Sequence, residues 1–350
     1  MSVEALYDQM KARLRDVVPD FELRHKAAIA DEINRLKVEK NAVILGHNYM
    51  EPALFHSIPD YTGDSLELSR KAAATDKDII VFCGVRFMAE TAKLLNPGKT
   101  VLLPSLRAGC SLAASITAED VRQLRARFPG VPVVTYVNTY ADVKAESDIC
   151  CTSSNAKAVV ESLGTHTVIF LPDEYLARNV AKETGKHIVF PTLTPHPATD
   201  TELDYQMIGW HGRCEVHEKF TVQDIRSVRE QFPDVVILAH PECSPDVVAA
   251  SDFSGSTTAM IKYVEKTTAP HFLLLTECSM GDNIMAANPD KEMLRLCSVR
   301  CPHMNQITLE DTRDALKFNQ YVIEVPEEIR AQAARAVERM IAIGPVGRVD

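Results

Sequence analysis

Three segments of this chain resemble one another, and this internal repeat constrains the fold more than any other feature of the sequence. Each segment begins with a short apolar run, passes through a polar pair and an acidic loop, and reaches a cluster of small hydroxyl residues before a helical stretch. The residues that end the three apolar runs are His47, Tyr136 and His240. The hydroxyl clusters follow 18, 17 and 16 residues later, at Ser65, Ser153 and Ser256. Three occurrences in the same order, at matching offsets, favour a true repeat over chance similarity.

Strand-length apolar runs alternate with helical periodicity through the middle of the chain, which is typical of βαβ units and parallel sheets. The runs are NAVILGHNY, KDIIVFCGV, GKTVLLPS, VPVVTYVNT, HTVIFLPD, KHIVFPT, DVVILAHP and HFLLLTE. Together with the repeat, they predict an α/β fold of three pseudo-threefold-related α/β/α domains with small parallel sheets, and not one continuous sheet.

Each repeat ends near a cysteine, at Cys110, Cys214 and Cys301, which lie 63, 78 and 61 residues past the strand-end residues. Equivalent positions in three related units suggest that the thiols converge on the axis. The chain lacks the tight cysteine spacing of a ferredoxin and the paired knuckles of a zinc ribbon. Two interpretations stay open: ligands of a metal cluster at an interface, or three buried core cysteines. Three thiolates on a four-iron cluster would leave one iron free to act as a Lewis acid.

The predicted domain boundaries follow the repeat. Residues 1–113 form an N-terminal helix and the first α/β domain, 114–215 the second, and 216–302 the third, with the cluster and the active site at their central interface. Residues 303–350 form a C-terminal helical segment that packs on the body of the protein, on the first domain. Within it, Pro326 is predicted to be the first residue of an amphipathic helix that ends before Gly344.

Composition excludes several classes of protein. The chain has 350 residues, of which 46% are apolar, so it exceeds one average domain. Its net charge is -10 and it has no long basic run, so we expect no nucleic-acid partner. The N-terminus lacks an apolar core, and no later run approaches the roughly 18 residues that cross a bilayer. We therefore expect a cytoplasmic protein without a membrane partner.

The nine cysteines are too widely spread for the disulfide framework of a small secreted domain. Apart from the three at the repeat ends, we expect them to be structural. They are Cys83, Cys150, Cys151, Cys243, Cys278 and Cys297. For Cys297, which lies close to Cys301 in the sequence, a redox role is the alternative to a structural one.

Polar residues at strand ends are candidates for the active site, because open α/β sheets bind ligands there. Two residues past the strand-end positions lie Tyr49, Asn138 and Glu242. Glu242 is the best candidate for acid/base work if burial raises its pKa, and the alternative is a helix-capping carboxylate. The hydroxyl clusters, which include Thr257, suit either an anion pocket or ordinary helix capping.

The sequence resembles the quinolinate synthase family over roughly residues 30 to 315. The matching strings are GHNY at 46–49, GDSLELS at 63–69, FMAETAK at 87–93, AGCSLA at 108–113, YVNT at 136–139, CEVHE at 214–218, AHPEC at 239–243, GST at 255–257, TE at 276–277 and CPHMNQITLE at 301–310. So many strings in one order make the resemblance specific.

This resemblance implies the condensation of iminoaspartate with dihydroxyacetone phosphate to quinolinate, with release of phosphate and water, in de novo NAD biosynthesis. It also implies one [4Fe-4S] cluster per chain, held by Cys110, Cys214 and Cys301, with one open iron. Glu242, Tyr49 and His47 would transfer protons. The implied substrate-binding residues are His47, Ser65, Tyr136, Asn138, Ser153, His217, His240, Glu242, Ser256 and Thr257. An L-aspartate oxidase would be the partner that supplies the imine.

Two alternatives have different consequences. Another [4Fe-4S] hydro-lyase would share the cluster but need no triose phosphate site, and a non-catalytic iron-sulfur redox sensor would need no acid/base residues. The sequence also departs from the family: Met50 stands where many relatives have glutamine, and TECSM lacks an expected glycine. Cys297 and Cys301 are separated by three residues, so a thiol-disulfide switch known in some relatives is not assumed.

Overall fold

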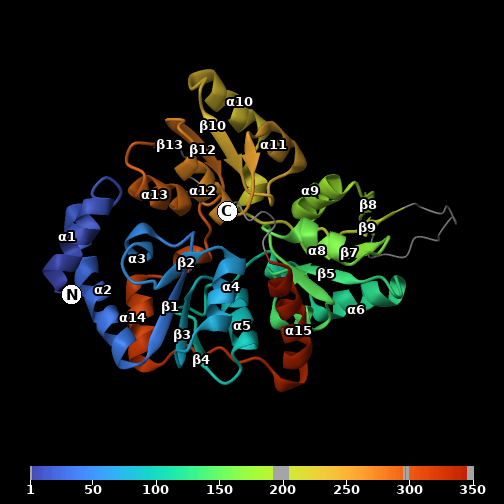
Figure 1. The fold of residues 1–350 in the computed structure, drawn as a ribbon, viewed down its shortest axis with the longest axis horizontal. Helices are drawn as coiled ribbons and strands as arrows, with labels where there is room; N and C mark the ends of the chain where they lie inside the picture. Colours follow the sequence, from blue (N-terminus) through green and yellow to red (C-terminus); the bar gives the residue numbers. More distant parts are fainter. Residues whose placement is uncertain (1, 192–204, 295, 297–298, 345–350) are drawn as a thin grey trace.

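The protein is described by a computed structural model that covers residues 2–191, 205–294, 296 and 299–344. Three separate parallel sheets, each flanked by helices, surround a common centre (Figure 1). The predicted fold class is therefore confirmed, and each sheet with its helices is called a unit below. The residue boundaries of the domains remain a prediction.

The first three strands have the same order in all three sheets, with the first strand next to the edge, and unit II has an additional strand beyond them. The order is β2-β1-β3-β4 in unit I, β6-β5-β7-β9-β8 in unit II and β11-β10-β12-β13 in unit III. The strands are β1 (Ala42–His47), β2 (Tyr61–Gly63), β3 (Ile79–Cys83), β4 (Thr100–Leu102), β5 (Val133–Tyr136), β6 (Ile149–Cys151), β7 (Val168–Leu171), β8 (Ile188–Val189), β9 (Met207–Ile208), β10 (Val236–Ala239), β11 (Phe253–Ser254), β12 (His271–Leu275) and β13 (Glu292–Leu294).

All eight predicted apolar runs contain strands, because a parallel strand covered on both faces must be apolar along its whole length. Every residue of β1, β5 and β7 is buried. The short edge strands β2, β6 and β11 were missed. Each has two or three residues and lies just before a hydroxyl cluster, so it has too little apolar sequence to be distinguished from a loop.

Helices cover both faces of the sheets and join the units to one another. They are α1 (Val3–Leu14), α2 (Asp20–Glu39), α3 (Pro52–Phe55), α4 (Ser65–Ala74), α5 (Arg86–Leu95), α6 (Ala118–Arg127), α7 (Ala141–Ala145), α8 (Ala156–Ser162), α9 (Glu174–Thr184), α10 (Val222–Gln231), α11 (Pro245–Ala250), α12 (Thr257–Lys266), α13 (Cys278–Ala287), α14 (Leu309–Phe318) and α15 (Glu327–Ile343). Among the described helices, none is both long and apolar enough to cross a membrane.

The C-terminal segment consists of two helices that lie in different places (Figure 1). Helix α14 packs against α2 and β3 of unit I, whereas α15 packs against α7 and β6 of unit II and also against α5. Pro326 is the N-cap of α15 and not its first residue, and Gly344 follows the end of the helix as expected. The buried face of α15 includes Ala333, Val337 and Met340, as expected for an amphipathic helix.

An aspartate fixes the first strand of each unit in the same way. The carboxylates of Asp60, Asp148 and Asp252 accept the backbone N–H of Ile44, Val133 and Ile237 at 2.8, 2.7 and 2.8 Å. Each also pairs with a basic residue of the helix before that strand: Lys37, Arg125 and Arg229. The carboxylate therefore links the return loop, the strand and the helix within one unit.

We expect Asp252→Ala to lower the free energy of unfolding by about 1–3 kcal/mol, because the N–H of Ile237 loses its acceptor. Arg229→Ala removes only the half-exposed ion pair of the same carboxylate and should cost below about 1 kcal/mol. Thermal unfolding of both variants measures the difference. Equal losses would show that the ion pair, and not the backbone hydrogen bond, stabilises the strand.

Candidate active site

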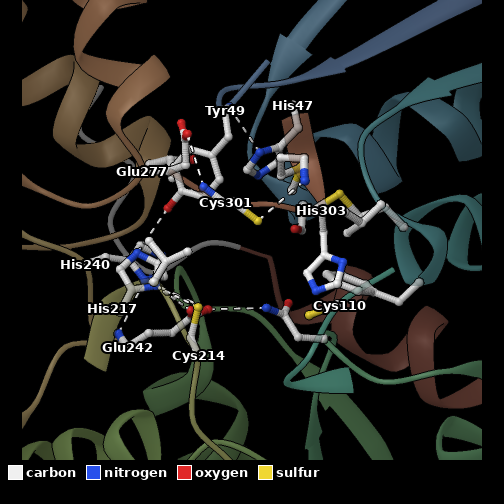
Figure 2. A pocket seen from close by; sticks show the side chains of 18 of the residues that line it. His47, Tyr49, Cys110, Cys214, His217, His240, Glu242, Glu277, Cys301 and His303 are labelled. Carbon is white, nitrogen blue, oxygen red and sulfur yellow. Dashed lines mark hydrogen bonds and ion pairs between the residues drawn. The ribbon is translucent and has the colours of Figure 1, made fainter. Parts of the chain in front are cut away.

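A central cavity lies where the carboxyl ends of the three sheets meet (Figure 2). It contains about 720 Å³ of space free of protein atoms, part of it open to solvent, which is within the usual range for small-molecule sites. Thirteen predicted site residues line it together: His47, Tyr49, Ser65, Cys110, Tyr136, Asn138, Ser153, Cys214, His217, His240, Glu242, Thr257 and Cys301. Sequence positions up to 254 residues apart thus meet in one place.

The three repeat-end cysteines share one local structure. Each lies three residues before a short 3-10 turn, at Ala113–Ser115, His217–Lys219 and Met304–Gln306. The first N–H of the turn points back at the sulfur: Ala113 and Met304 donate to Cys110 and Cys301 at 3.5 Å, and His217 donates to Cys214. Hydrogen bonds to sulfur stabilise thiolates and tune the potentials of iron-sulfur clusters.

Burial raises the pKa of Cys110 to about 12 and that of Cys301 to about 11, and it raises the pKa of Cys214 well above its usual value. Without a bound cation these thiols are protonated, and a cation would have to displace their protons.

A second set of possible metal ligands shares Cys214 with the three cysteines. The ligand atoms of Cys214, His217 and Glu242 lie within 4.8 Å of one another and could hold a single metal ion.

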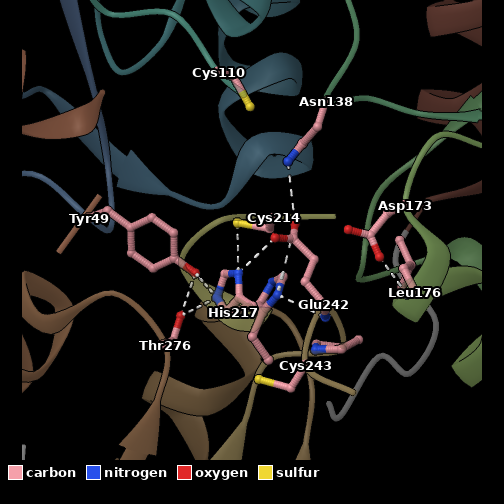
Figure 3. Close-up of polar contacts among 12 residues, drawn as sticks. Tyr49, Cys110, Asn138, Asp173, Leu176, Cys214, His217, Glu242, Cys243 and Thr276 are labelled. Atoms are coloured by element: carbon pink, nitrogen blue, oxygen red, sulfur yellow. Dashed lines mark hydrogen bonds and ion pairs between the residues drawn. The ribbon is translucent and has the colours of Figure 1, made fainter. Parts of the chain in front are cut away.

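Glu242 is the centre of the polar network in the cavity (Figure 3). Its Oε1 accepts the hydroxyl of Tyr136 at 2.5 Å and the amide of Asn138 at 3.3 Å. Its Oε2 lies 2.8 Å from Nδ1 of His217. The carboxylate therefore joins side chains of units II and III with the loop that carries Cys214.

The pKa of Glu242 is lowered, contrary to the raised value that its role as an acid would require. Burial alone opposes ionisation, but interactions with His217 and His240 and hydrogen bonds from His217 and Tyr136 outweigh it. Glu242 is therefore a carboxylate at neutral pH. It can accept protons or anchor donors, and it is not a preformed acid.

A hydroxyl chain extends from His217 to Tyr49. Oγ1 of Thr276 lies 2.6 Å from the hydroxyl of Tyr49 and 3.0 Å from Nε2 of His217. On the other side of the ring, Nδ1 of His217 lies 2.8 Å from Oε2 of Glu242 and 3.2 Å from the sulfur of Cys214. Burial raises the pKa of Tyr49 well above its usual value, so the phenol stays protonated and can donate.

His47 and His240 occupy equivalent positions and have the same tautomer. Nδ1 of His47 accepts the N–H of Tyr49 at 3.2 Å, and Nδ1 of His240 accepts the N–H of Glu242 at 3.3 Å. An acceptor Nδ1 places the ring proton on Nε2. Burial lowers the pKa of both rings to about 3, so both are neutral.

The hydroxyl clusters differ in their access to the cavity. Ser65, Ser153 and Thr257 line it, each near the first turn of a helix. Ser256 does not belong to the described lining residues. The hydroxyl of Ser256 accepts the N–H of Ala259 at 3.3 Å and caps α12. The neighbouring Thr257 lines the cavity where both residues were predicted to lie.

Several known proteins are similar to this chain over most of its length. The profile of the family described as "Quinolinate synthetase A protein" matches residues 31–342. The chain is 56% identical over 342 residues to quinolinate synthase 2 of Mesorhizobium japonicum, covering 98% of each chain. It is 56% identical over 313 residues to the quinolinate synthase of Xylella fastidiosa, covering 89% of this chain and 86% of that one. It is 52% identical over 343 residues to that of Agrobacterium fabrum, covering 98% and 92%.

The chain belongs to the quinolinate synthetase A family. It is therefore an enzyme, which sets aside the non-catalytic redox sensor. The family strings at 46–49, 136–139 and 239–243 are the loops at the carboxyl ends of β1, β5 and β10, so the resemblance lies where the cavity is.

Two residues that line the cavity, Glu277 and His303, were given no role from the sequence, and neither was Thr276, which bonds to Tyr49 and His217. Glu277 is the N-cap residue of α13 and accepts the N–H of Cys301 at 3.4 Å, and burial raises its pKa to about 7. The sequence also contains a pattern that marks the three cysteine loops as equivalent. Seven residues after each cysteine a helix cap follows with the pattern Thr-x-x-Asp, at Thr117, Thr221 and Thr308.

The other described cysteines are buried, which fits the structural role expected for them. They are Cys83, Cys150, Cys151, Cys243 and Cys278. Cys297 lies outside the described residues, so its redox role remains only a hypothesis.

The two neutral histidines predict how stability depends on pH. Between about pH 6.5 and pH 3 the unfolded chain binds a proton at each ring and the folded chain does not, so stability decreases as pH falls through this range. Each ring should account for a loss of about 2 kcal/mol between pH 7 and pH 5. Melting temperatures at the two pH values should therefore differ less for His47→Gln than for wild type.

The exposed His166 provides the control for this prediction. His166→Gln should keep the wild-type difference between pH 7 and pH 5. An unchanged difference in His47→Gln would show that this ring is protonated in the folded protein.

Proposed function

We propose that this enzyme condenses iminoaspartate with dihydroxyacetone phosphate to form quinolinate, with release of phosphate and water, in de novo NAD biosynthesis. The observation that carries the proposal is the meeting of Cys110, Cys214 and Cys301 with the Glu242 network in one cavity. Membership of the quinolinate synthetase A family adds independent support. An L-aspartate oxidase would supply the imine, in the cytoplasm.

The proposed cofactor is one [4Fe-4S] cluster held by the three cysteines. Three features fit it: one thiol from the end of each repeat, an N–H directed at each sulfur, and a cavity that all three sulfurs face (Figure 2). When bound, the cluster would supply a Lewis-acidic iron without a cysteine ligand. Oxygen atoms of a substrate are suitable partners for such an iron.

The protein's own residues account for the proton transfers. Removal of a proton from carbon requires a base, and Glu242 is ionised and lies beside His217. Loss of water or phosphate requires a proton donor at the departing oxygen. Tyr49 is protonated and connected to His217 through Thr276, and His47 presents an Nε2 proton, so both are suited to that role.

Substrate anions would be held mainly by neutral groups. Ser65, Ser153 and Thr257 offer hydroxyls near helix N-termini from all three units, and Asn138, Tyr136 and His240 offer further donors. Iminoaspartate has two carboxylates and the triose has one phosphate, so three anionic groups require binding. Three hydroxyl loops around one cavity match that number.

The test is anaerobic purification followed by iron and sulfide analysis, an electronic spectrum and a quinolinate assay. Wild type should contain about four irons per chain. Cys110→Ser, Cys214→Ser and Cys301→Ser should each lose the cluster and the activity. Cys83→Ser changes a buried cysteine of β3 outside the cavity and should keep both.

Three outcomes would contradict the proposal. A wild-type protein that stays colourless after anaerobic reconstitution would exclude the cluster. A single metal ion without sulfide, retained in Cys110→Ser but lost in Cys214→Ser, would favour the site formed by Cys214, His217 and Glu242. A cluster without quinolinate formation would favour the alternative [4Fe-4S] hydro-lyase.

A further inference from the structure

A buried amide of α13 holds the loop that carries Tyr49. Nδ2 of Asn283 donates to the backbone oxygens of Asn48 at 3.2 Å and of Met50 at 2.8 Å. These are the carbonyls of the residues immediately before and after Tyr49. Asn283 is 3% exposed and belongs to unit III, whereas the loop belongs to unit I. The contact therefore fixes a cavity residue of one unit from the next.

The same arrangement recurs at Glu242. Nδ2 of Asn179 donates to the backbone oxygens of Pro241 at 2.9 Å and of Cys243 at 3.0 Å, the two carbonyls that flank Glu242. Asn179 is buried in α9 of unit II, and the loop belongs to unit III. Asn179 and Asn283 are each the sixth residue of their helices, so the two contacts are related by the pseudo-threefold axis.

The third loop is held by a different residue. The sixth residue of α5 is Thr91, whose hydroxyl bonds to Phe87 of its own helix, so it cannot serve as a holder. Instead, Nζ of Lys144 donates to the backbone oxygens of Val137, at 2.9 Å, and of Thr139, the two carbonyls that flank Asn138. Lys144 is fully buried in α7. Unit I still contacts this loop region, because Glu90 of α5 accepts the N–H of Ala141 at 2.9 Å.

We propose that Asn179, Asn283 and Lys144 are positioning residues that set the cavity side chains Glu242, Tyr49 and Asn138 through the carbonyls on either side of each. Buried carbonyls need donors in any protein, so one such contact would be unremarkable. Here one donor group spans the two carbonyls around the same repeat position in all three units. Because the carbonyls of both neighbouring residues are held, the backbone of the residue between them has little freedom to move.

The roles of these positioning residues rest on the proposed function, because they act through residues placed in its active site. Catalytic geometry tolerates little displacement, and a shift of about 1 Å can reduce a rate by about 100-fold. Loss of Asn179 or Asn283 should therefore reduce kcat, through Glu242 or Tyr49. Loss of Lys144 should raise KM, since Asn138 is proposed to bind substrate and not to transfer protons.

Asn96 is a matched control for the asparagines. Its buried amide also donates to two backbone oxygens, of Ala72 at 2.9 Å and Ala92 at 3.0 Å, but neither they nor Asn96 line the cavity. Asn96→Leu thus breaks the same number of buried hydrogen bonds outside the active site. A general loss of stability should affect it as much as Asn179→Leu and Asn283→Leu.

The experiment compares holoenzymes with Asn179→Leu, Asn283→Leu, Lys144→Met and Asn96→Leu, with rates normalised to cluster content and measured well below every melting temperature. We expect Asn96→Leu to keep kcat and KM within about twofold of wild type. Asn179→Leu and Asn283→Leu should reduce kcat by about 10- to 100-fold. Lys144→Met should raise KM about tenfold, with a smaller change in kcat. If a leucine variant does not fold, Asn179→Ser or Asn283→Ser replaces it and should also reduce kcat more than Asn96→Ser.

If the wild type forms quinolinate and the Asn179 and Asn283 variants have the same kcat as their Asn96 counterparts, this inference is overturned. The proposed function would then remain intact. An unchanged KM in Lys144→Met would overturn the inference for that residue. A wild type that binds the cluster but forms no quinolinate would instead refute the proposed function.

Discussion

A parallel strand brings its carboxyl end to one edge of its sheet, and three such edges face a common centre in this protein. Most of the chemistry follows from that constraint. The loop after the first strand of each unit contributes two polar side chains, and a later loop contributes one cysteine. No single unit contains a complete site: Glu242 needs donors from unit II, and Tyr49 needs Thr276 from unit III.

Much of the fold was predictable because its signals are local and repeated. Eight apolar runs became strands, and three nearly equal offsets indicated three units instead of one sheet. The short edge strands escaped prediction because they form only by pairing with a neighbour, which leaves little trace in two or three residues. The start of α15 was misplaced by one residue, since proline suits both the N-cap and the first helical position.

The site was predictable in membership but not in electrostatics. The residue type of Glu242 and its place at a strand end identified it, yet the direction of its pKa shift depends on His217 and Tyr136, which lie 25 and 106 positions away. Ser256 and Thr257 show the same limit on a smaller scale. Both are hydroxyl residues at the start of a helix, and only the path of the backbone decides which one caps α12 and which one faces the cavity.

The asparagine contacts also affect how this architecture could be assembled from parts. Asn179 and Asn283 each bond to the loop of a unit other than their own. The amide donor and its carbonyl acceptors therefore never belong to the same unit. Unit III has both halves of this arrangement, so in isolation it would expose the unpaired carbonyls of Pro241 and Cys243 on one side and the unused amide of Asn283 on the other. Three identical copies could satisfy these groups only by closing head to tail into a ring, the way heterologous interfaces form cyclic trimers. In this single chain, Lys144 lets the loop of unit II form without a donor from unit I, so the cycle of amide contacts is open at that one interface.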